Sequence, residues 1–455
     1  MPSSSRSRSR RTCTVLGALA VTGGLVASGC SSGASGDAGT ATSSASTASA
    51  TTASATSSAS TKTAVASTAS GATFLSSATI HEISMTFDQA TYAQMLATYA
   101  ASGDKEWIEV TVVIDGKTYA SAGARLKGNS SLRGAATGST APESLPWLIR
   151  LDKFVDGQNH NGLTELVVRG NSTQTSLNEA VALDLLREAG LASEQAALVR
   201  LTVNGGAADL RLVIENLGDE WQDANFESDG ILYKAESSGD YSYRGTDPAA
   251  YVDVFEQESG KNDNLTPLIE LLDFVNNSDD ATFAAELSKH LDVEAFAKYL
   301  AYETLIDNFD DIDGPGNNSY LFWDESTNRF TVVAWDHNLA FGSRPGGAGG
   351  AGGAPGGRAA GGVQVPAGGA GGAGARAGGP GGKANALVTR FNSVAAFSSL
   401  VTKAKADLTA TLFTDGTASA SLRRWSELIQ TSASDLVPAA TLTSEVAAIQ
   451  KYAVP

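Results

Sequence analysis

Residues 307–342 read DNFDDIDGPGNNSYLFWDESTNRFTVVAWDHNLAFG, a stretch in which acids and amides crowd around two short apolar runs. The runs at 320–323 and 330–335 are typical of two strands joined by a turn. Asp336 directly follows the second run, at a strand boundary, where residues carry function more often than packing. An acidic loop, a strand pair and an acid at the strand end form the arrangement with which phosphotransferases hold metal ions against a triphosphate.

Five blocks of the chain resemble the CotH kinase family (spore coat protein H-like). They are RLKGNSS at 125–131, GILYK at 230–234, NFD at 308–310, NSY at 318–320 and AWDHN at 334–338, the last followed by FG at 341–342. Proteins of this family are kinase-like, with a remodelled active site that lacks the usual kinase motifs. The resemblance extends from residue 80 to the C-terminus. It implies an α+β fold of the atypical protein-kinase type, with a strand-rich N-terminal lobe and a helical C-terminal lobe.

The resemblance also implies roles for three residues of the acidic stretch. Asp310 takes the place of the catalytic aspartate that accepts the proton of a substrate hydroxyl, and Asn318 and Asp336 take the places of the two metal ligands. The expected cofactor is ATP with Mg²⁺ or Mn²⁺, because a divalent ion neutralises the phosphates while a carboxylate orients the nucleophile. His337 and Asn338 stand where the family has an aromatic–acid pair.

Five charged residues outside this stretch form the expected nucleotide and phosphate site: Lys127, Arg125, Arg150, Glu215 and Lys234. In RLKGNSS, a glycine beside small hydroxyl residues lets backbone N–H groups approach an anion, while a basic side chain supplies charge. A polar hairpin end is the alternative interpretation of the same spacing. The similar stretch RGNS at 169–172 is interpreted as a coincidence of turn chemistry.

The roles of two of these five residues, Arg150 and Glu215, depend on how they compare with the family pattern. Arg150 stands where the family usually has a lysine, and the two side chains are not interchangeable in a tight pocket. Glu215 keeps the family's acid and is a candidate partner for Arg150 or Lys234, or else a solvated glutamate at a strand end.

Hydrophobic periodicity predicts further strands and helices along the chain. Strands are expected at 108–114, 146–151, 163–168, 199–203, 210–214 and 231–234, and helices at 87–101, 176–189 and from 266 and 293 onward. Asp292 is expected to cap the last of these helices, which leads into the acidic loop and gives it a rigid base. The tail, 384–455, is expected to be helical and to pad the larger lobe.

The chain has 455 residues and a net charge of −17. An acidic surface argues against nucleic acid as a partner and against a polybasic membrane patch. Cys13 and Cys30 are the only cysteines, so the folded region is expected to have no disulfide and no thiolate metal site. Its four histidines are too scattered along the sequence to indicate a zinc centre.

Residues 1–30 are typical of a bacterial lipoprotein signal peptide, with an arginine-rich start and an apolar core too short to span a bilayer. The segment ends ASGC, which resembles a lipobox with Cys30 as the lipidated residue; an ordinary cleaved signal peptide is the alternative. Residues 31–75, rich in Ser, Thr and Ala, are expected to be a disordered tether off the cell membrane. The kinase-like domain would occupy 76–455, with a disordered glycine-rich insertion at 345–383.

Three classes of function fit these features. The first is a metal-dependent, ATP-binding, protein kinase-like phosphotransferase that acts on Ser or Thr of a protein substrate at the cell surface. The second is a catalytically weak or inactive member of the family that serves as a binding or structural protein of the envelope, which Arg150, Asn338 and the tether favour. The third is a calcium-stabilised adhesion module, which needs only the acidic loop, although the EF-hand spacing fails at Phe309.

Overall fold

The computed structural model describes residues 74–132, 140–236, 240–314, 318–344 and 385–453. The expectations for residues 1–73, which include the signal peptide, Cys30 and most of the tether, lie outside the described residues, as does the glycine-rich stretch at 345–383. Within the described ranges, no helix combines the length and the apolar character needed to cross a membrane.

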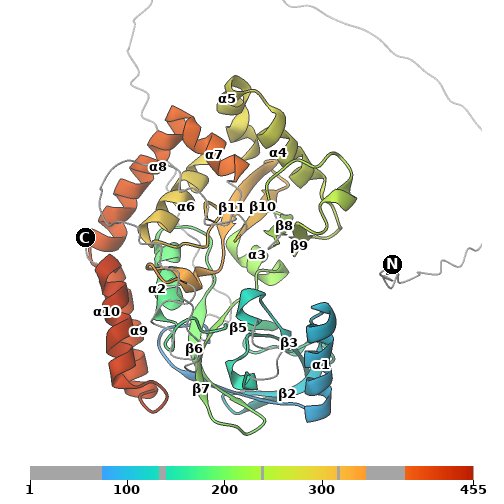
Figure 1. Cartoon of the computed structure of the whole chain (residues 1–455), viewed down its shortest axis with the longest axis vertical. Helices are drawn as coiled ribbons and strands as arrows, with labels where there is room; N and C mark the ends of the chain where they lie inside the picture. Colours follow the sequence, from blue (N-terminus) through green and yellow to red (C-terminus); the bar gives the residue numbers. More distant parts are fainter. Residues whose placement is uncertain (1–73, 133–139, 237–239, 315–317, 345–384, 454–455) are drawn as a thin grey trace, which may run out of the picture. The chain divides into compact units, whose positions relative to one another are not determined.

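Seven strands close into a barrel in the order β1-β2-β3-β4-β5-β7-β6 (Figure 1). They are β1 (His81–Thr86), β2 (Ile108–Ile114), β3 (Lys117–Leu126), β4 (Trp147–Arg150), β5 (Glu165–Val168), β6 (Ala196–Val203) and β7 (Asp209–Ile214). All neighbours are antiparallel except β1 and β6, which run parallel with His81 opposite Val199. The four alternating apolar residues of β2 are all buried, so the predicted inward face of this strand is confirmed.

A second sheet has four antiparallel strands in the order β11-β10-β8-β9. They are β8 (Gly230–Ala235), β9 (Phe255–Gln257), β10 (Ser319–Asp324) and β11 (Arg329–Ala334). The hairpin predicted within the acidic stretch is confirmed, because β10 pairs with β11. Tyr320 of β10 lies opposite Lys234 of β8, which lies opposite Glu256 of β9. These three side chains share one face of the sheet, since directly paired residues point to the same side.

Ten α-helices are described. They are α1 (Gln89–Ser102), α2 (Leu177–Glu188), α3 (Asp219–Asn225), α4 (Thr266–Asn277), α5 (Asp280–His290), α6 (Val293–Leu305), α7 (Ala386–Ser393), α8 (Ala395–Leu408), α9 (Thr417–Ser432) and α10 (Ala439–Ala453). Helix α2 packs against α9, α10 against α9, and α6 against both α8 and β11 (Figure 1). The helices predicted at 176–189, from 266, from 293 and in the tail are confirmed.

Helix α6 begins where the sequence predicts. The Asp292 side chain accepts a hydrogen bond from the backbone N–H of Ala295 at 3.0 Å, which satisfies one of the free N–H groups of the first turn. The helix is buried at Phe296 and Ala301, and it ends at Leu305, directly before the acidic loop. Because α6 also packs against β11, the loop and the end of β11 share one support.

The interior contains two hydrophobic clusters. One fills the barrel and includes the fully buried Trp147. The other joins α2, the second sheet and the C-terminal helices, and Phe391 and Trp425 of the tail belong to it. The chain is therefore a mixed α/β protein with a strand-rich N-terminal region and a helical C-terminal region.

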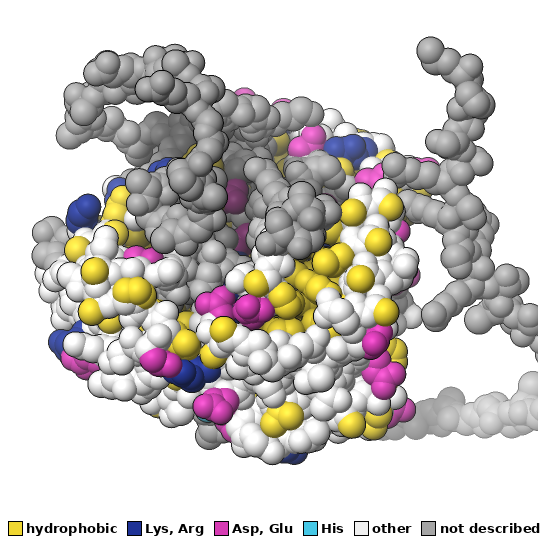
Figure 2. Space-filling model, turned by 60° about the horizontal axis from the view of Figure 1, so that its bottom comes forward, with side chains coloured by type: hydrophobic (Ala, Val, Ile, Leu, Met, Phe, Trp, Pro, Cys, Tyr) yellow, Lys and Arg dark blue, Asp and Glu magenta, His cyan; other side chains and the backbone are white. Residues whose placement is uncertain are grey.

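Charged side chains of both signs are scattered on the face shown in Figure 2. Among the residues described, no continuous patch of Lys and Arg is visible on this face. The absence of a nucleic-acid partner remains a prediction from the net charge.

Candidate functional site

Asp336 lies at the corner where β11 ends and a short 3₁₀ turn (His337–Leu339) begins. Its φ angle is 64°, in the left-handed region that residues other than glycine seldom adopt. Strain of this kind persists only where the surrounding structure imposes it, and it gathers at active sites and ligand clamps. The prediction that Asp336 terminates a strand is confirmed.

The structure brings Asp310, Asn318 and Asp336 together. The Asn318 side chain hydrogen-bonds to the carboxyl group of Asp310, and Asp336 lies near enough to repel the charged form of that group. Burial, and then the charge of Asp336, raise the pKa of Asp310 to about 6, against the opposing effect of Asn318. The acidic loop, the start of β10 and the end of β11 thus meet at one place.

These three residues fit a divalent ion. Carboxylate and amide oxygens are the hard donors that Mg²⁺ and Mn²⁺ accept. The repulsion between Asp310 and Asp336 favours positive charge beside them, of which Arg169 supplies part at Asp336. In the ranges that the structure describes, no group of three or more His, Cys, Asp or Glu side chains is arranged to hold a metal ion. An ion here would therefore complete its shell with water or phosphate oxygens, as magnesium commonly does.

Arg169, which directly follows β5, is the cation that Asp336 contacts. Its Nε lies 2.8 Å from a carboxylate oxygen of Glu179 in the first turn of α2, and its Nη2 donates to Asp336. The guanidinium carbon lies 5.4 Å from the ring centre of Trp335. Only 11% of the Arg169 side chain and 3% of the Glu179 side chain are exposed. The ion pair is therefore largely removed from water, where it is screened little.

The stretch RGNS at 169–172, whose likeness to KGNS was interpreted as a coincidence of turn chemistry, contributes further contacts at this place. Besides the contacts of Arg169, the Ser172 hydroxyl donates to the backbone carbonyl of Asn338 at 2.7 Å. KGNS at 127–130 likewise follows a strand, β3. The basic residues that open the two stretches lie over the same indole ring, that of Trp335.

Lys127 and its basic neighbours form a second part of the site. Lys127 Nζ lies 5.7 Å from the ring centre of Trp335 and donates to the amide oxygen of Asn216. Burial, together with the nearby charges of Lys234 and Arg125, lowers the pKa of Lys127 to about 8. Arg125 has a buried Nε without a hydrogen-bond partner. Three of the five predicted phosphate-site residues therefore lie close enough for their charges to interact, and Lys127 is the one that reaches the ring of Trp335.

Lys234 is neutralised by acids of the second sheet. Its Nζ lies 2.7 Å from Glu236, 3.5 Å from Glu256 and 3.7 Å from Glu258. Because an anion would have to compete with these carboxylates, Lys127 and Arg125 are better placed than Lys234 to meet a phosphate group.

Arg150 and Glu215 have other partners in the structure, and the phosphate-binding role expected of them stays a prediction. Arg150 pairs with Asp152 at 2.8 Å and with Glu165 at 3.6 Å. Glu215 accepts a hydrogen bond from the backbone N–H of Gln195 at 2.7 Å. The expected pairing of Glu215 with Arg150 or Lys234 was wrong, because the carboxylate of Glu215 turns toward the start of β6.

Glu215 makes the stability of the protein depend on pH. Burial raises the pKa of this carboxyl group from 4.5 to about 7, so the folded state holds a proton that the unfolded state releases. Stability is therefore lost as the pH rises from 4.5 to 7. A Glu215→Gln variant keeps the acceptor for Gln195 and cannot ionise. We expect it to be more stable than the wild type by about 2–3 kcal/mol at pH 8, and equally stable near pH 4.

Chemical denaturation at the two pH values would check this expectation. The exposed Glu188→Gln variant serves as the control and should show no such pH dependence. An equal effect of Glu215→Gln at both pH values would contradict the argument.

The last helix, α10, contacts the site from outside. Its Glu445 carboxylate accepts hydrogen bonds from the backbone N–H groups of Gln174 and Thr175, both at 3.0 Å, in the loop between Arg169 and α2. The Tyr452 hydroxyl donates to Asp307 of the acidic loop at 3.2 Å. The tail therefore does more than pad the fold, since it also ties down two loops of the site.

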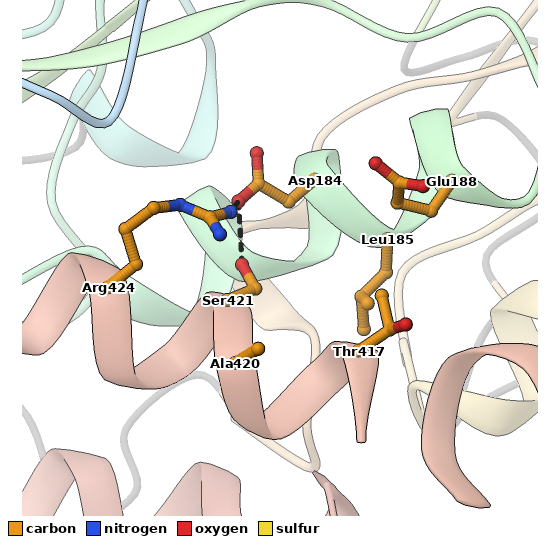
Figure 3. A pocket seen from close by; sticks show the side chains of 7 residues that line it. All are labelled: Asp184, Leu185, Glu188, Thr417, Ala420, Ser421 and Arg424. Atoms are coloured by element: carbon orange, nitrogen blue, oxygen red, sulfur yellow. Dashed lines mark hydrogen bonds and ion pairs between the residues drawn. The ribbon is translucent and has the colours of Figure 1, made fainter. Parts of the chain in front are cut away.

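A hollow of about 250 Å³ between α2 and α9 lies apart from these residues (Figure 3). Asp184 on its wall accepts hydrogen bonds from Ser421 at 2.6 Å, Arg424 at 2.5 Å and Trp425 at 2.9 Å. These contacts satisfy the carboxylate and join the two helices. The hollow therefore serves the packing of α2, the helix that carries Glu179, and includes none of the predicted site residues.

The chain matches the CotH kinase protein family over residues 124–450, most of its length, and belongs to this family. It is also similar to the inner spore coat protein H of Bacillus subtilis (strain 168), with 24% identity over 196 residues. That match covers 42% of this chain and 53% of the relative, so the chain spans about half the length of the curated protein it matches.

Proposed function

We propose that the protein is a kinase-like phosphotransferase that moves the terminal phosphoryl group of ATP to a Ser or Thr hydroxyl of a protein. Membership of the CotH kinase family supports a kinase-like function. The observation that carries the proposal is the meeting of Asp310, Asn318 and Asp336 beside Trp335, whose ring also lies next to Lys127. In this proposal, the barrel region and the helical region are the two lobes of a kinase-like fold.

Each residue has a chemical task in the proposed reaction. The pKa of Asp310 is about 6, so above this pH its carboxylate is ionised and can accept the proton of the attacking hydroxyl. Asn318 and Asp336 would hold Mg²⁺ or Mn²⁺, which neutralises phosphate charge when bound. Lys127 and Arg125 would hold the phosphate groups, since both are basic and lie close enough for their charges to interact.

The proposed location is the outer face of the cell membrane, with a lipid on Cys30 as the anchor. Support for this comes from the arginine-rich start, the apolar core and the ASGC sequence that ends at Cys30. The Ser, Thr and Ala-rich stretch that follows would keep the domain away from the membrane.

A second candidate function is that of a binding or structural protein that keeps the fold without turnover. The observation that favours it is the ion pair between Arg169 and Asp336, because the guanidinium already neutralises the proposed metal ligand. The half-buried Arg150, which pairs with Asp152, also fits this candidate.

Thermal unfolding of the protein with and without ATP plus Mg²⁺ or Mn²⁺ separates the two candidates. A ligand at about a hundred times its dissociation constant should add about 2.7 kcal/mol to the folded state. We expect the wild type to show a clear rise in Tm and an Asp336→Asn variant to lose it. Asp435→Asn is the matched control, because it also removes the carboxylate partner of an arginine, Arg200. This variant should keep the ATP-induced rise in Tm. The absence of a rise with either metal would contradict ATP-dependent catalysis.

A further inference from the structure

Buried hydrogen bonds connect the residue after Asp336 with the loop that carries Asp310. His337 Nε2 donates to one carboxylate oxygen of Glu303 at 3.0 Å. The amide nitrogen of Asn308 donates to the other carboxylate oxygen at 2.9 Å. The amide oxygen of Asn308 then accepts a hydrogen bond from the backbone N–H of Asp310 at 3.3 Å. Glu303 of α6 thus stands between the two loops of the site.

This chain of contacts is closed to solvent. His337 is 0% exposed, and Glu303 and Asn308 are each 1% exposed. A buried ion pair is weak evidence for stability, because apolar residues of similar volume often stabilise a core as well or better. Added stability therefore does not account for a buried polar network in this position. A better account is that the network fixes one arrangement of the loops that it joins.

Backbone contacts bind the same two loops to each other. The N–H of Phe341 donates to the carbonyl of Ile306 at 2.5 Å, while the N–H of Asn308 donates to the carbonyl of Glu303 at 3.1 Å and ties the acidic loop to α6. The N–H of Gly342 donates to the carbonyl of Asp307 at 3.3 Å. The loops before Asp310 and after Asp336 thus form one unit, with the Glu303 carboxylate at its centre.

We propose that Glu303 is a positioning residue that sets the place of Asp310 relative to Asp336, by holding Asn308 on one carboxylate oxygen and His337 on the other. Glu303 does not reach the reacting groups itself. The catalytic consequence rests on the proposed function, whereas the effect on the loop does not.

Exchanging the hydrogen-bond donor and acceptor between residues 303 and 308 tests this role. In Glu303→Gln, the single amide oxygen can accept from only one of the two donors that the carboxylate serves. If it stays on the Nε2–H of His337, the new NH₂ group meets the NH₂ group of Asn308, and the chain of hydrogen bonds breaks there. Adding Asn308→Asp restores an acceptor opposite the donor. The new carboxylate can still accept the backbone N–H of Asp310, and the formal charge of the pair returns to its original value.

Amide hydrogen exchange of residues 307–312 reports on the loop without any need for activity. We expect exchange to rise about tenfold or more in Glu303→Gln and to return toward the wild-type rate in the double variant. Glu194→Gln is the matched control, because Glu194 is equally buried near His337 and has no hydrogen bond to either loop. It should leave the exchange of this segment unchanged.

Transfer of label from γ-³²P-ATP with Mg²⁺ onto the protein or a general Ser/Thr protein substrate gives the second readout. We expect Glu303→Gln to lower kcat about 10- to 100-fold, with the KM for ATP and the ATP-induced rise in Tm unchanged, and the double variant to recover the rate. Wild-type exchange in Glu303→Gln, or faster exchange that the double variant fails to reverse, would overturn the proposal. If the wild type transfers no label while the exchange pattern holds, the proposed function fails and the positioning of the loop by Glu303 stands.

Discussion

Replacing Arg169 with methionine should lower the free energy of unfolding at pH 7 by about 3–5 kcal/mol, because it removes one partner of a buried ion pair. The guanidinium lies between the carboxylates of Glu179 and Asp336. Burial raises the pKa of Glu179, Arg169 counteracts this, and the charge of Asp336 raises the pKa further. Without the cation, two acids that repel each other would remain, one of them, Glu179, almost completely buried.

Urea denaturation of the variant and the wild type would measure this loss. Arg200→Met is the matched control, because Arg200 also pairs with an aspartate, Asp435, but that carboxylate is 61% exposed. Its replacement should have a much smaller effect, as exposed ion pairs contribute little. Arg169→Lys should recover only part of the loss, since an ammonium group lacks the planar fork that meets two carboxylates. Equal losses for Arg169→Met and Arg200→Met would contradict the account of the site.

Replacing Asp310 with asparagine should lower the rate of phosphoryl transfer by about 10²- to 10⁴-fold, which is the usual contribution of a general base. Asparagine has nearly the same shape and keeps an oxygen that can accept from Asn318. The ATP-induced rise in Tm should therefore remain, while the proton acceptor is lost. A label-transfer assay with ATP and Mg²⁺ would measure the rate.

The neighbouring acid Asp313 provides the control for Asp310. An Asp313→Asn variant changes the charge of the same loop by the same amount and should keep most of the rate. The wild-type rate should also fall as the pH is lowered through about 6, because Asp310 then gains a proton and can no longer act as a base. Equal rates for Asp310→Asn and the wild type would remove Asp310 from the proposed mechanism.

Much of the local structure was predictable from sequence. The hairpin of β10 and β11 was indicated by two apolar runs around a turn, and the start of α6 by Asp292. Both patterns depend on residues that are close in sequence. The convergence of Asp310, Asn318 and Asp336 followed from the family resemblance, which carries spatial information that spacing alone lacks.

The partners of Asp336 could not be found in the same way. Arg169 lies 167 residues before Asp336 in the chain, and no local pattern reports a contact over that separation. Glu179 and Glu303 occur in helices, where an isolated glutamate normally indicates the solvent face. Their burial depends on long-range packing, of α2 against the 3₁₀ turn that follows β11 and of α6 against β11 itself.

The error at Glu215 has a similar physical origin. The side chain of an acid at the end of a strand can point to either face of the sheet. A shift of one residue in the strand is enough to change the face. The neighbouring Asn216, which sequence reasoning passed over, is the residue that meets Lys127.

The parallel pairing of β1 with β6 gives the polypeptide a late step in its assembly. β1 cannot complete its pairing until β6 is available, and four other strands lie between the two in sequence; His81 of β1 pairs with Val199 of β6. Until then, one edge of β1 exposes unpaired N–H and C=O groups, a template on which strands of other molecules can add. Pairings between distant segments also form slowly. We therefore expect the yield of folded protein to fall steeply as the concentration of newly made chains increases, even under conditions in which the finished barrel is stable.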